Sequence, residues 1–301
     1  DFVPKDHVDL GAPIGLDFDA AAKISGARFV VLKGNAAKLH RALAQFMLDV
    51  HTEQHGYQEV YAPYMVSAQA MQGTGQLPKF EADLFKVPRK MGGEHPDDGG
   101  ERIENFYLIP TAEVPVTNVY RDTILKDTDL PIKMTAYSPC FRREAGSFGK
   151  EVRGLNRVHQ FEKVEIIQIV HPDKSDDTLN EMVAHVENLL ISLGLQYRIL
   201  RLCGGDMGFA AAITYDFEVY SAAQEKWLEV SSVSNFNNYQ TYRMKCRFKD
   251  QEGKTQFAHS LNGSSLALPR IYAAIVENYQ TETGINLPEV LAPYFGGKQL
   301  I

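Results

Sequence analysis

Positive charge gathers in the segment from Cys140 to Glu165, although the chain as a whole carries a net charge of −7. The segment holds four arginines and two lysines, and a glycine-rich stretch separates its two ends. The ends are typical of strands and the middle is typical of an exposed loop. A basic loop in an acidic protein indicates that an anion is bound locally, because a surface that coats nucleic acid needs extensive positive charge.

Alternation along the two strand-like ends sorts these side chains onto faces. Arg142 and Glu144 share one face of the first strand, and Arg143 points to the other. The returning strand groups three residues on one face, namely Arg157, Phe161 and Glu165. A guanidinium, an aromatic ring and carboxylates suit an anion, a flat base, and an ammonium or hydroxyl group. On this segment alone, a solvated hairpin with surface salt bridges explains the pattern equally well.

The segment resembles motif 2 of class II aminoacyl-tRNA synthetases, in which an FRxE strand, a basic loop and an RxxxF strand follow one another. These elements are Phe141 to Glu144 and Arg157 to Phe161. Residues 261–280 resemble motif 3, with Arg270 in the first turn of a helix. Further segments are similar to seryl-tRNA synthetases in order and spacing: LIPTAEVPVTN, GTGQLPKF, CGGDMGFAA, TYDFEV and LNGSS. The resemblance runs from about residue 24 to residue 297, nearly the whole chain.

This resemblance implies a bent ATP whose α-phosphate is attacked by an amino acid carboxylate, with no protein nucleophile. Arg142 would contact the phosphate and the carboxylate, and Glu144 would accept from the adenine amino group. Phe161 and Arg270 would sandwich the adenine. The implied catalytic residues are Arg142, Glu229 and Arg270. The implied ATP-binding residues are Arg142, Arg143, Glu144, Arg157, Val158, Phe161, Glu229, Val230, Ser231, Ser232 and Arg270.

The resemblance also implies a magnesium ion on Glu229 and Ser232, whose oxygen atoms suit this cation. Strict alternation along a strand would instead put Glu229 and Ser231 on one face. We therefore expect a bulge or a strand end that brings Ser232 round to the face of Glu229.

The implied amino acid pocket is selective for L-serine. Carboxylates around a small cavity suit the substrate ammonium and hydroxyl, and a site built to hydrogen-bond a hydroxyl rejects alanine. For Glu113, which precedes Val114-Pro115, a role at the start of a helix is equally open. The implied serine-binding residues are Thr111, Ala112, Glu113, Arg142, Glu165, Asn262 and Ser264.

Composition sets the broad class of the protein. A chain of 301 residues, 44% hydrophobic and 23% charged, is typical of a globular protein with a large core. Its three cysteines are far apart and form neither a disulfide framework nor a zinc site. We find no signal peptide and no apolar run of transmembrane length, so we expect a cytoplasmic protein with no membrane contact.

Hydrophobic periodicity predicts three long helices, at residues 35–56 with Asn35 as N-cap, at 175–194 and at about 268–280. Short strands that follow one another without intervening helices fill much of the rest. We expect one α+β domain over residues 1–301 with the class II synthetase catalytic fold, a mainly antiparallel sheet flanked by helices. Residues 88–105 are polar and glycine-rich, which predicts a surface insert between two strands.

The family resemblance also implies partners. Serine would pass to tRNA(Ser), and to tRNA(Sec), and the loop with Lys150 and Arg153 would meet the acceptor end. No sustained heptads indicate the N-terminal coiled-coil arm of the family, so we expect that arm to be absent and transfer to be weak. The helix from Asn35 and the strand near Pro63 correspond to motif 1, which implies a homodimer. Core packing explains their apolar stripe equally well.

Two other functions fit parts of the pattern. The first is a paralogue that adenylates serine or another small amino acid and loads it onto a carrier protein. Such homologues have a cysteine-ligated metal in the amino acid pocket, and no candidate cysteine lies there. The second is a non-catalytic regulatory paralogue, which would normally have lost Arg142, Glu229 or Arg270.

Overall fold

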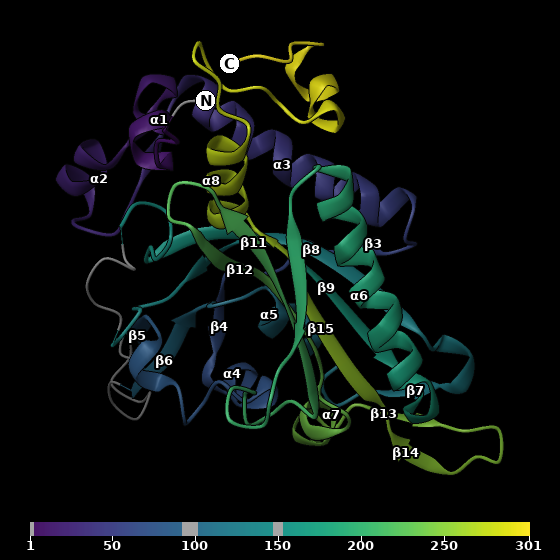
Figure 1. Cartoon of the computed structure of the whole chain (residues 1–301). Coiled ribbons are helices and arrows are strands. Elements are labelled where there is room, and N and C mark those ends of the chain that lie inside the picture. The colour runs from purple at the N-terminus through teal and green to yellow at the C-terminus, as the bar shows by residue number, and fades with distance from the viewer. Residues whose placement is uncertain (1–2, 92–101, 147–152) are drawn as a thin grey trace.

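A computed structural model describes residues 3–91, 102–146 and 153–301. At its centre lies a seven-stranded sheet in the order β10-β11-β12-β15-β9-β8-β3 (Figure 1). The pairing is antiparallel apart from the short β3–β8 pair. The expected α+β fold with a mainly antiparallel sheet is confirmed. The strands are β3 (Gln58–Glu59), β8 (Ile132–Phe141), β9 (Gln160–Val170), β10 (Tyr197–Arg201), β11 (Ile213–Ser221), β12 (Lys226–Asn235) and β15 (His259–Ala267).

Three long helices cover one face of this sheet, and all three were predicted from periodicity. They are α3 (Gly34–Glu53), α6 (Ser175–Ser192) and α8 (Leu268–Asn278). Their apolar stripes join alternate strand residues such as Val164, Ile166 and Phe217 in the main core cluster. On the opposite face of the sheet, Met134, Ala136 and Ile167 belong to a second apolar cluster. The N-cap prediction was wrong, because α3 is capped by Lys33 rather than Asn35, with no side-chain capping bond.

The antiparallel pair β8–β9 forms the base of the basic segment at residues 140–165. Its register runs from Ile132↔Ile169 to Phe141↔Gln160. The strand β8 ends at Phe141, and Glu144 has a φ of 50°, in the left-handed region. The prediction that Arg142, Arg143 and Glu144 alternate along a strand is therefore wrong. The backbone N–H of Arg142 still donates to the carbonyl of His159 at 2.9 Å, which holds the two chain segments together.

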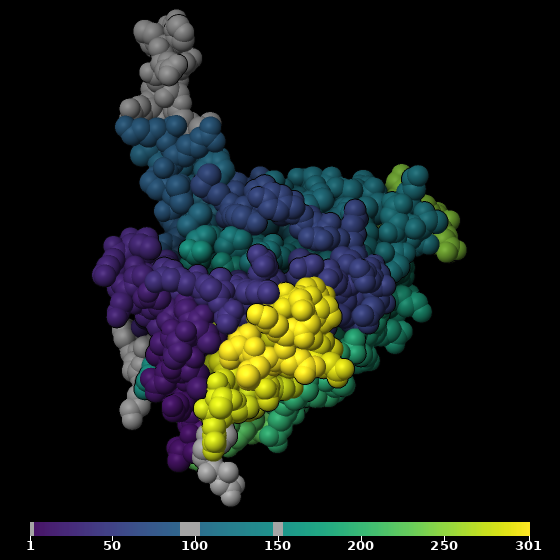
Figure 2. Space-filling model, turned by 90° about the horizontal axis from the view of Figure 1, so that it is seen from above, coloured from purple at the N-terminus to yellow at the C-terminus, as the bar shows by residue number. Residues whose placement is uncertain are grey.

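Smaller sheets surround the central one. The first consists of β4 (Met65–Ser67), β5 (Lys86–Met91) and β6 (Arg102–Leu108). The hairpin β5–β6 projects from the body in Figure 2 (blue). The expected insert at 88–105 is thus partly strand, at Pro88–Met91 and Arg102–Asn105, and its remainder lies outside the described residues. The other small sheets pair β1 (Leu16–Asp17) with β2 (Val31–Leu32), and join β7 (Ile124–Lys126), β13 (Arg247–Lys249) and β14 (Thr255–Phe257).

Short helices complete the fold. Figure 2 shows the C-terminal residues (yellow) beside the N-terminal region (purple), where η5 packs on α3. No helix in the described ranges is long and apolar enough to cross a membrane. The short helices are α1 (His7–Ile14), α2 (Phe18–Ile24), α4 (Ala68–Thr74), α5 (Glu113–Asn118), α7 (Tyr239–Met244), η1 (Glu81–Asp83), η2 (Asp127–Asp129), η4 (Pro172–Lys174) and η5 (Glu289–Phe295).

Candidate active site

A polar cavity of about 320 Å³ lies on the face of the sheet that the long helices leave open. Its walls come from β9, β12 and β15, the segment after β8, and the start of α8. Most of the predicted site residues line it: Thr111, Glu113, Arg142, Glu144, Arg157, Val158, Phe161, Glu229, Val230, Ser231, Ser232, Asn262, Ser264 and Arg270. Residues from five separate parts of the chain therefore meet in one place.

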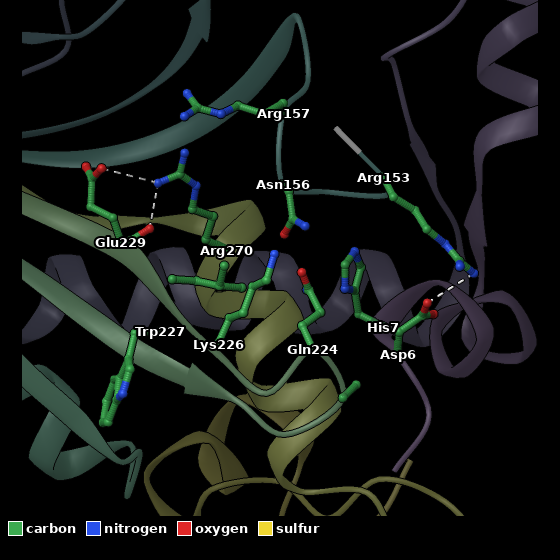
Figure 3. A pocket seen from close by; sticks show the side chains of 12 residues that line it. Asp6, His7, Arg153, Asn156, Arg157, Gln224, Lys226, Trp227, Glu229 and Arg270 are labelled. Atoms are coloured by element: carbon green, nitrogen blue, oxygen red, sulfur yellow. Dashed lines mark hydrogen bonds and ion pairs between the residues drawn. The ribbon is translucent and has the colours of Figure 1, made fainter. Parts of the chain in front are cut away.

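One half of the cavity is an arginine-rich clamp around an aromatic ring. The guanidinium of Arg142 lies 5.2 Å from the centre of the Phe161 ring, and its Nε donates to the carbonyl of Pro110 at 3.2 Å. Across the cavity, Nη1 of Arg270 donates to the backbone carbonyl of Glu229 at 2.6 Å and lies 3.7 Å from its carboxylate (Figure 3). The two guanidiniums and the ring offer a stacking platform beside concentrated positive charge.

Arg157 completes this clamp. Its Nη1 lies 3.2 Å from Oε2 of Glu144, and its side chain is 41% exposed. Arg157 and Glu144 line the same cavity, although neither residue lies in a strand. Both arginines at the mouth, Arg157 and Arg270, are paired with a carboxylate, so an incoming phosphate would exchange one anionic partner for another.

A bulge in β12 places Glu229 and Ser232 on the same face. Opposite β11, Glu218 pairs with Glu229 and Phe217 pairs with Ser231, so Val230 is the extra residue. Of the two expected possibilities, a bulge or a strand end, the structure has the bulge, and Ser232 lines the cavity. The described residues contain no cluster of three His, Cys, Asp or Glu that would hold a metal alone. Glu229 and Ser232 fit a Mg²⁺ ion that takes its other ligands from substrate phosphates and water.

Asp216 of β11 is a polar residue of this face that the sequence analysis missed. It pairs directly with Ser232, and Oδ1 is buried without a hydrogen-bond partner in the described structure. Burial raises the pKa of Asp216 to about 6, a hydrogen bond from Ser232 opposes the rise, and the charge of Glu229 adds to it. The alternation of TYDFEV could have placed Asp216 beside Ser232 once the bulge was known.

The other half of the cavity backs onto a buried network centred on Glu165, a predicted serine-binding residue that is fully buried and is not among the residues lining the cavity. Oε1 accepts from Oγ1 of Thr111 at 2.9 Å, and Oε2 accepts from Nδ2 of Asn262 at 2.5 Å. Oγ of Ser264 lies 3.5 Å from Oε1. The register explains this arrangement, because Ser264 of β15 is the direct partner of Glu165 on β9.

Lys163 is a second residue that the sequence analysis missed. Its side chain, 7% exposed, pairs with the carboxylate of Glu165, and Nζ donates to Oγ of Ser264 at 3.1 Å. The lysine compensates the buried charge of Glu165 and lines the cavity. Alternation along β9 contains the signal, since Lys163 shares the face of Phe161 and Glu165.

Glu113 serves as a helix start and as a cavity wall at once. It is the first residue of α5, and its backbone N–H donates to Oγ1 of Thr111 at 3.2 Å. Burial raises the pKa of Glu113 to about 7, and the nearby charge of Glu165 raises it further. Oε1 accepts from Nε2 of Gln240 at 2.6 Å, which works against that rise. The helix-start role of Glu113 is therefore present, and its serine-binding role stays a prediction.

Some predicted residues lie outside the cavity wall. Ala112 is buried and caps α5, so its side chain contributes packing. Arg143 is exposed and is not among the described residues that line the cavity. Lys150, predicted to meet the acceptor end, lies outside the described residues. Arg153 is described, and its Nη2 lies 3.0 Å from Oδ2 of Asp6.

The residues of the cavity can therefore bind a phosphorylated nucleotide and a small amine with a hydroxyl group side by side. The arginine half can hold a base and phosphates. The buried half offers carboxylate oxygens that can accept from an ammonium and a hydroxyl. The two halves meet at Arg142, whose guanidinium can bridge a phosphate and a carboxylate.

Comparisons with known proteins point in the same direction. Residues 96–279 match the family model described as the tRNA synthetase class II core domain of the G, H, P, S and T types. A serine–tRNA ligase from Herminiimonas arsenicoxydans is 59% identical over 298 residues, which are 99% of this chain and 68% of that relative. One from Neisseria meningitidis is 58% identical over 298 residues, 99% of this chain and 67% of that protein. The chain thus spans about two thirds of the length of these relatives.

Solved structures agree with the sequence relatives. The seryl-tRNA synthetase of Pyrococcus horikoshii, complexed with ATP, is 37% identical with a TM-score of 0.89. The match covers 100% of this chain and 65% of that structure. The cytoplasmic serine–tRNA ligase of Naegleria fowleri, in complex with AMP, is 32% identical with a TM-score of 0.88, over 100% of this chain and 61% of that one.

Proposed function

This chain belongs to the serine–tRNA ligase family of class II aminoacyl-tRNA synthetases, and we propose that it activates L-serine with ATP and transfers the seryl group to tRNA(Ser). One observation carries the proposal. Arg142 lies beside Phe161 and lines the same cavity as Thr111, so its guanidinium is placed to contact both substrates. The relatives solved with ATP and with AMP support the nucleotide half.

The first step joins serine to the nucleotide. A carboxylate oxygen of serine attacks the α-phosphorus in line, the new O–P bond forms seryl-adenylate, and the bond to the bridging oxygen breaks to release pyrophosphate. Arg142 holds the carboxylate against the α-phosphate and stabilises the charge that grows there. Arg157 binds the departing phosphates after exchanging its carboxylate partner, and Arg270 stacks on the adenine opposite Phe161. In the second step a ribose hydroxyl of the tRNA attacks the seryl carbonyl and releases AMP.

Magnesium would be held by Glu229 and Ser232. When bound, it neutralises charge on the phosphate oxygens. The chain itself contributes the bulge at Val230 that aligns the two ligands, and Arg270, which donates to the backbone of Glu229 and fixes that ligand's position.

The buried half supplies selectivity for serine. The hydroxyl of Thr111, which lines the cavity and is oriented by Glu165 behind it, is in place to accept from the substrate ammonium, and Glu113 is in place to accept from the substrate hydroxyl. Alanine would leave Glu113 without that donor, which costs affinity because the carboxyl is buried. For the other site residues we propose the roles that the family resemblance implies.

We also propose that the protein acts as a homodimer in the cytoplasm. The short β3 pairs only with β8 among the described strands, so it forms a sheet edge. Tyr61 and Met65, which follow it, are 85% and 46% exposed, a combination that favours burial by a second copy. The free cysteines, Cys140, Cys203 and Cys246, suit a reducing compartment.

Amino acid-dependent exchange between pyrophosphate and ATP tests the activation step. We expect exchange with serine, and much less with threonine, alanine or glycine. Absence of exchange with all four would contradict an adenylating enzyme. A preference for glycine or alanine would favour a paralogue that loads a carrier protein.

A further inference from the structure

The N-terminal helix α1 borders a second cavity, of about 650 Å³, that is continuous with the arginine half of the site. The two cavities share four lining residues, Asn156, Arg157, Glu229 and Arg270. In Figure 3, His7 lies between Asn156 and Asp6 on the wall of this cavity. A residue from the start of the chain is therefore built into the surroundings of the ATP site.

His7 is only 2% exposed, and both of its ring nitrogens are used. Nε2 accepts from the backbone N–H of Leu155 at 3.0 Å, so that nitrogen carries no proton. Nδ1 lies 2.8 Å from Oε1 of Glu277 and is therefore the donor to that carboxylate. The ring thus ties a loop residue to a helix residue through one fixed tautomer.

Glu277, the helix partner, is also buried, with 2% of its surface exposed. Its Oε1 also accepts from the backbone N–H of His7 at 3.1 Å, and its Oε2 accepts from Oγ of Ser221. A buried carboxylate with three donors is a satisfied and rigid anchor. It lies on α8, the same helix that carries Arg270 in its first turn.

Leu155, the loop partner, lies two residues before Arg157 and three before Val158. Gly154 brings the loop against the ring, because a Cβ added there would lie 2.2 Å from Nε2 of His7. Its φ of 64° also belongs to the left-handed region that favours glycine. The loop conformation and the position of His7 are therefore mutually dependent.

We propose that His7 is a positioning residue for ATP, which links the loop of Arg157 to the helix of Arg270. Arg157 and Arg270, the two arginines proposed to contact ATP, come from separate elements, and His7 holds both elements through one ring. Without this link the loop must be ordered when ATP binds, and that ordering weakens ATP binding. The proposal rests on the proposed function.

The Michaelis constants of wild type and three variants in pyrophosphate exchange provide the test. The double variant His7→Phe/Glu277→Gln removes the link without leaving an unpaired buried carboxylate. We expect its KM for ATP to rise by about five- to tenfold, the loss of one buried hydrogen bond to the loop. The KM for serine should change by less than about twofold, because the Glu165 network does not touch α1. His7→Gln should restore the KM for ATP, since its amide can donate to Glu277 and accept from Leu155.

His171→Phe is the matched control. His171 directly follows β9 and forms an ion pair with Asp173. The control substitution should leave both constants unchanged. Equal rises in the two KM values, or a lower melting temperature with unchanged KM values, would show that His7 has a purely structural role.

Hydrogen exchange tests the same link without relying on a folded double variant. In the wild type without ATP, the Leu155 amide should be protected from hydrogen exchange. In His7→Gln this amide should exchange only slightly faster than in the wild type. Rapid exchange of that amide in the wild type would overturn the proposal. Because this readout needs no turnover, it remains decisive even if the wild type shows no exchange activity and the proposed function fails.

Discussion

The two halves of the active site are built on opposite principles. In the nucleotide half, charged side chains remain partly in water: Arg157 is 41% exposed and Glu229 is 48% exposed. In the serine half, Glu165 is fully buried and Lys163 is 7% exposed. Exposed ion pairs are weak and easily exchanged, whereas a buried, fully bonded network is rigid. Under the proposed function, we expect ATP to bind by exchanging carboxylate partners and serine to bind to a site that is already formed.

Arg142, where the halves meet, is where a substitution should have the largest effect. We expect Arg142→Ala to lower the rate of serine-dependent exchange by about 10²–10³-fold, because it removes the donor to the developing charge. The exchange rate of Arg142→Lys should lie between those of the wild type and Arg142→Ala, since lysine keeps the charge and loses the bidentate geometry. A loss smaller than about fivefold in Arg142→Ala would break the assignment of Arg142 to both substrates.

The pH dependence of stability tests whether Glu113, in the serine half, is buried and protonated. Its pKa is about 7 in the folded protein, against an ordinary 4.5, so the folded state holds a proton that the unfolded state has lost. Stability of the wild type should therefore fall as pH rises from about 4.5 to about 7. Glu113→Gln removes this dependence and should gain on the order of 3 kcal/mol relative to wild type between pH 4 and pH 8. Urea unfolding at several pH values measures the difference, and parallel pH profiles would contradict a buried, protonated Glu113.

Thr111 tests whether the buried half acts on serine alone. Thr111→Val keeps the shape and removes the hydroxyl that donates to Glu165 at 2.9 Å. The KM for serine should rise by about tenfold or more, because a hydrogen bond to a charged group is lost. The KM for ATP should stay within about twofold of wild type. Steady-state exchange kinetics provide both values, and equal rises would show that the two halves are not independent.

Arg143 should give the smallest effect, although it is adjacent to Arg142. Its side chain is exposed and does not line the cavity in the described structure. We expect Arg143→Ala to change the exchange rate by less than about twofold, as is usual for an exposed charge away from the reacting groups. A loss as large as that of Arg142→Ala would restore Arg143 to the ATP-binding residues implied by the family resemblance.

Sequence patterns predicted the long helices, the antiparallel sheet and most of the cavity wall. They succeeded where alternation holds, as for Phe161 and Glu165 on β9. The same alternation failed after Phe141, because the chain leaves the strand and Glu144 adopts a left-handed φ. A bulge or a strand end was expected because the family resemblance puts Glu229 and Ser232 on one face, and the structure has a bulge at Val230. Asp216 belongs to an adjacent strand whose register the bulge shifts, and His7 lies 148 residues before its loop partner. Local periodicity could place Asp216 only once the bulge was known, and it carries no information on the contact of His7.

Binding of stable seryl-adenylate mimics tests the division between the two halves most directly. Titration calorimetry would compare a seryl-sulfamoyl adenosine with its alanyl counterpart, which differs only by the hydroxyl. We expect the seryl compound to bind at least about 100-fold more tightly, because the alanyl compound leaves a buried carboxyl without its donor. Arg142→Ala should weaken both compounds to a similar degree. Equal affinities of the wild type for the two compounds would contradict a preformed pocket that selects serine by its hydroxyl.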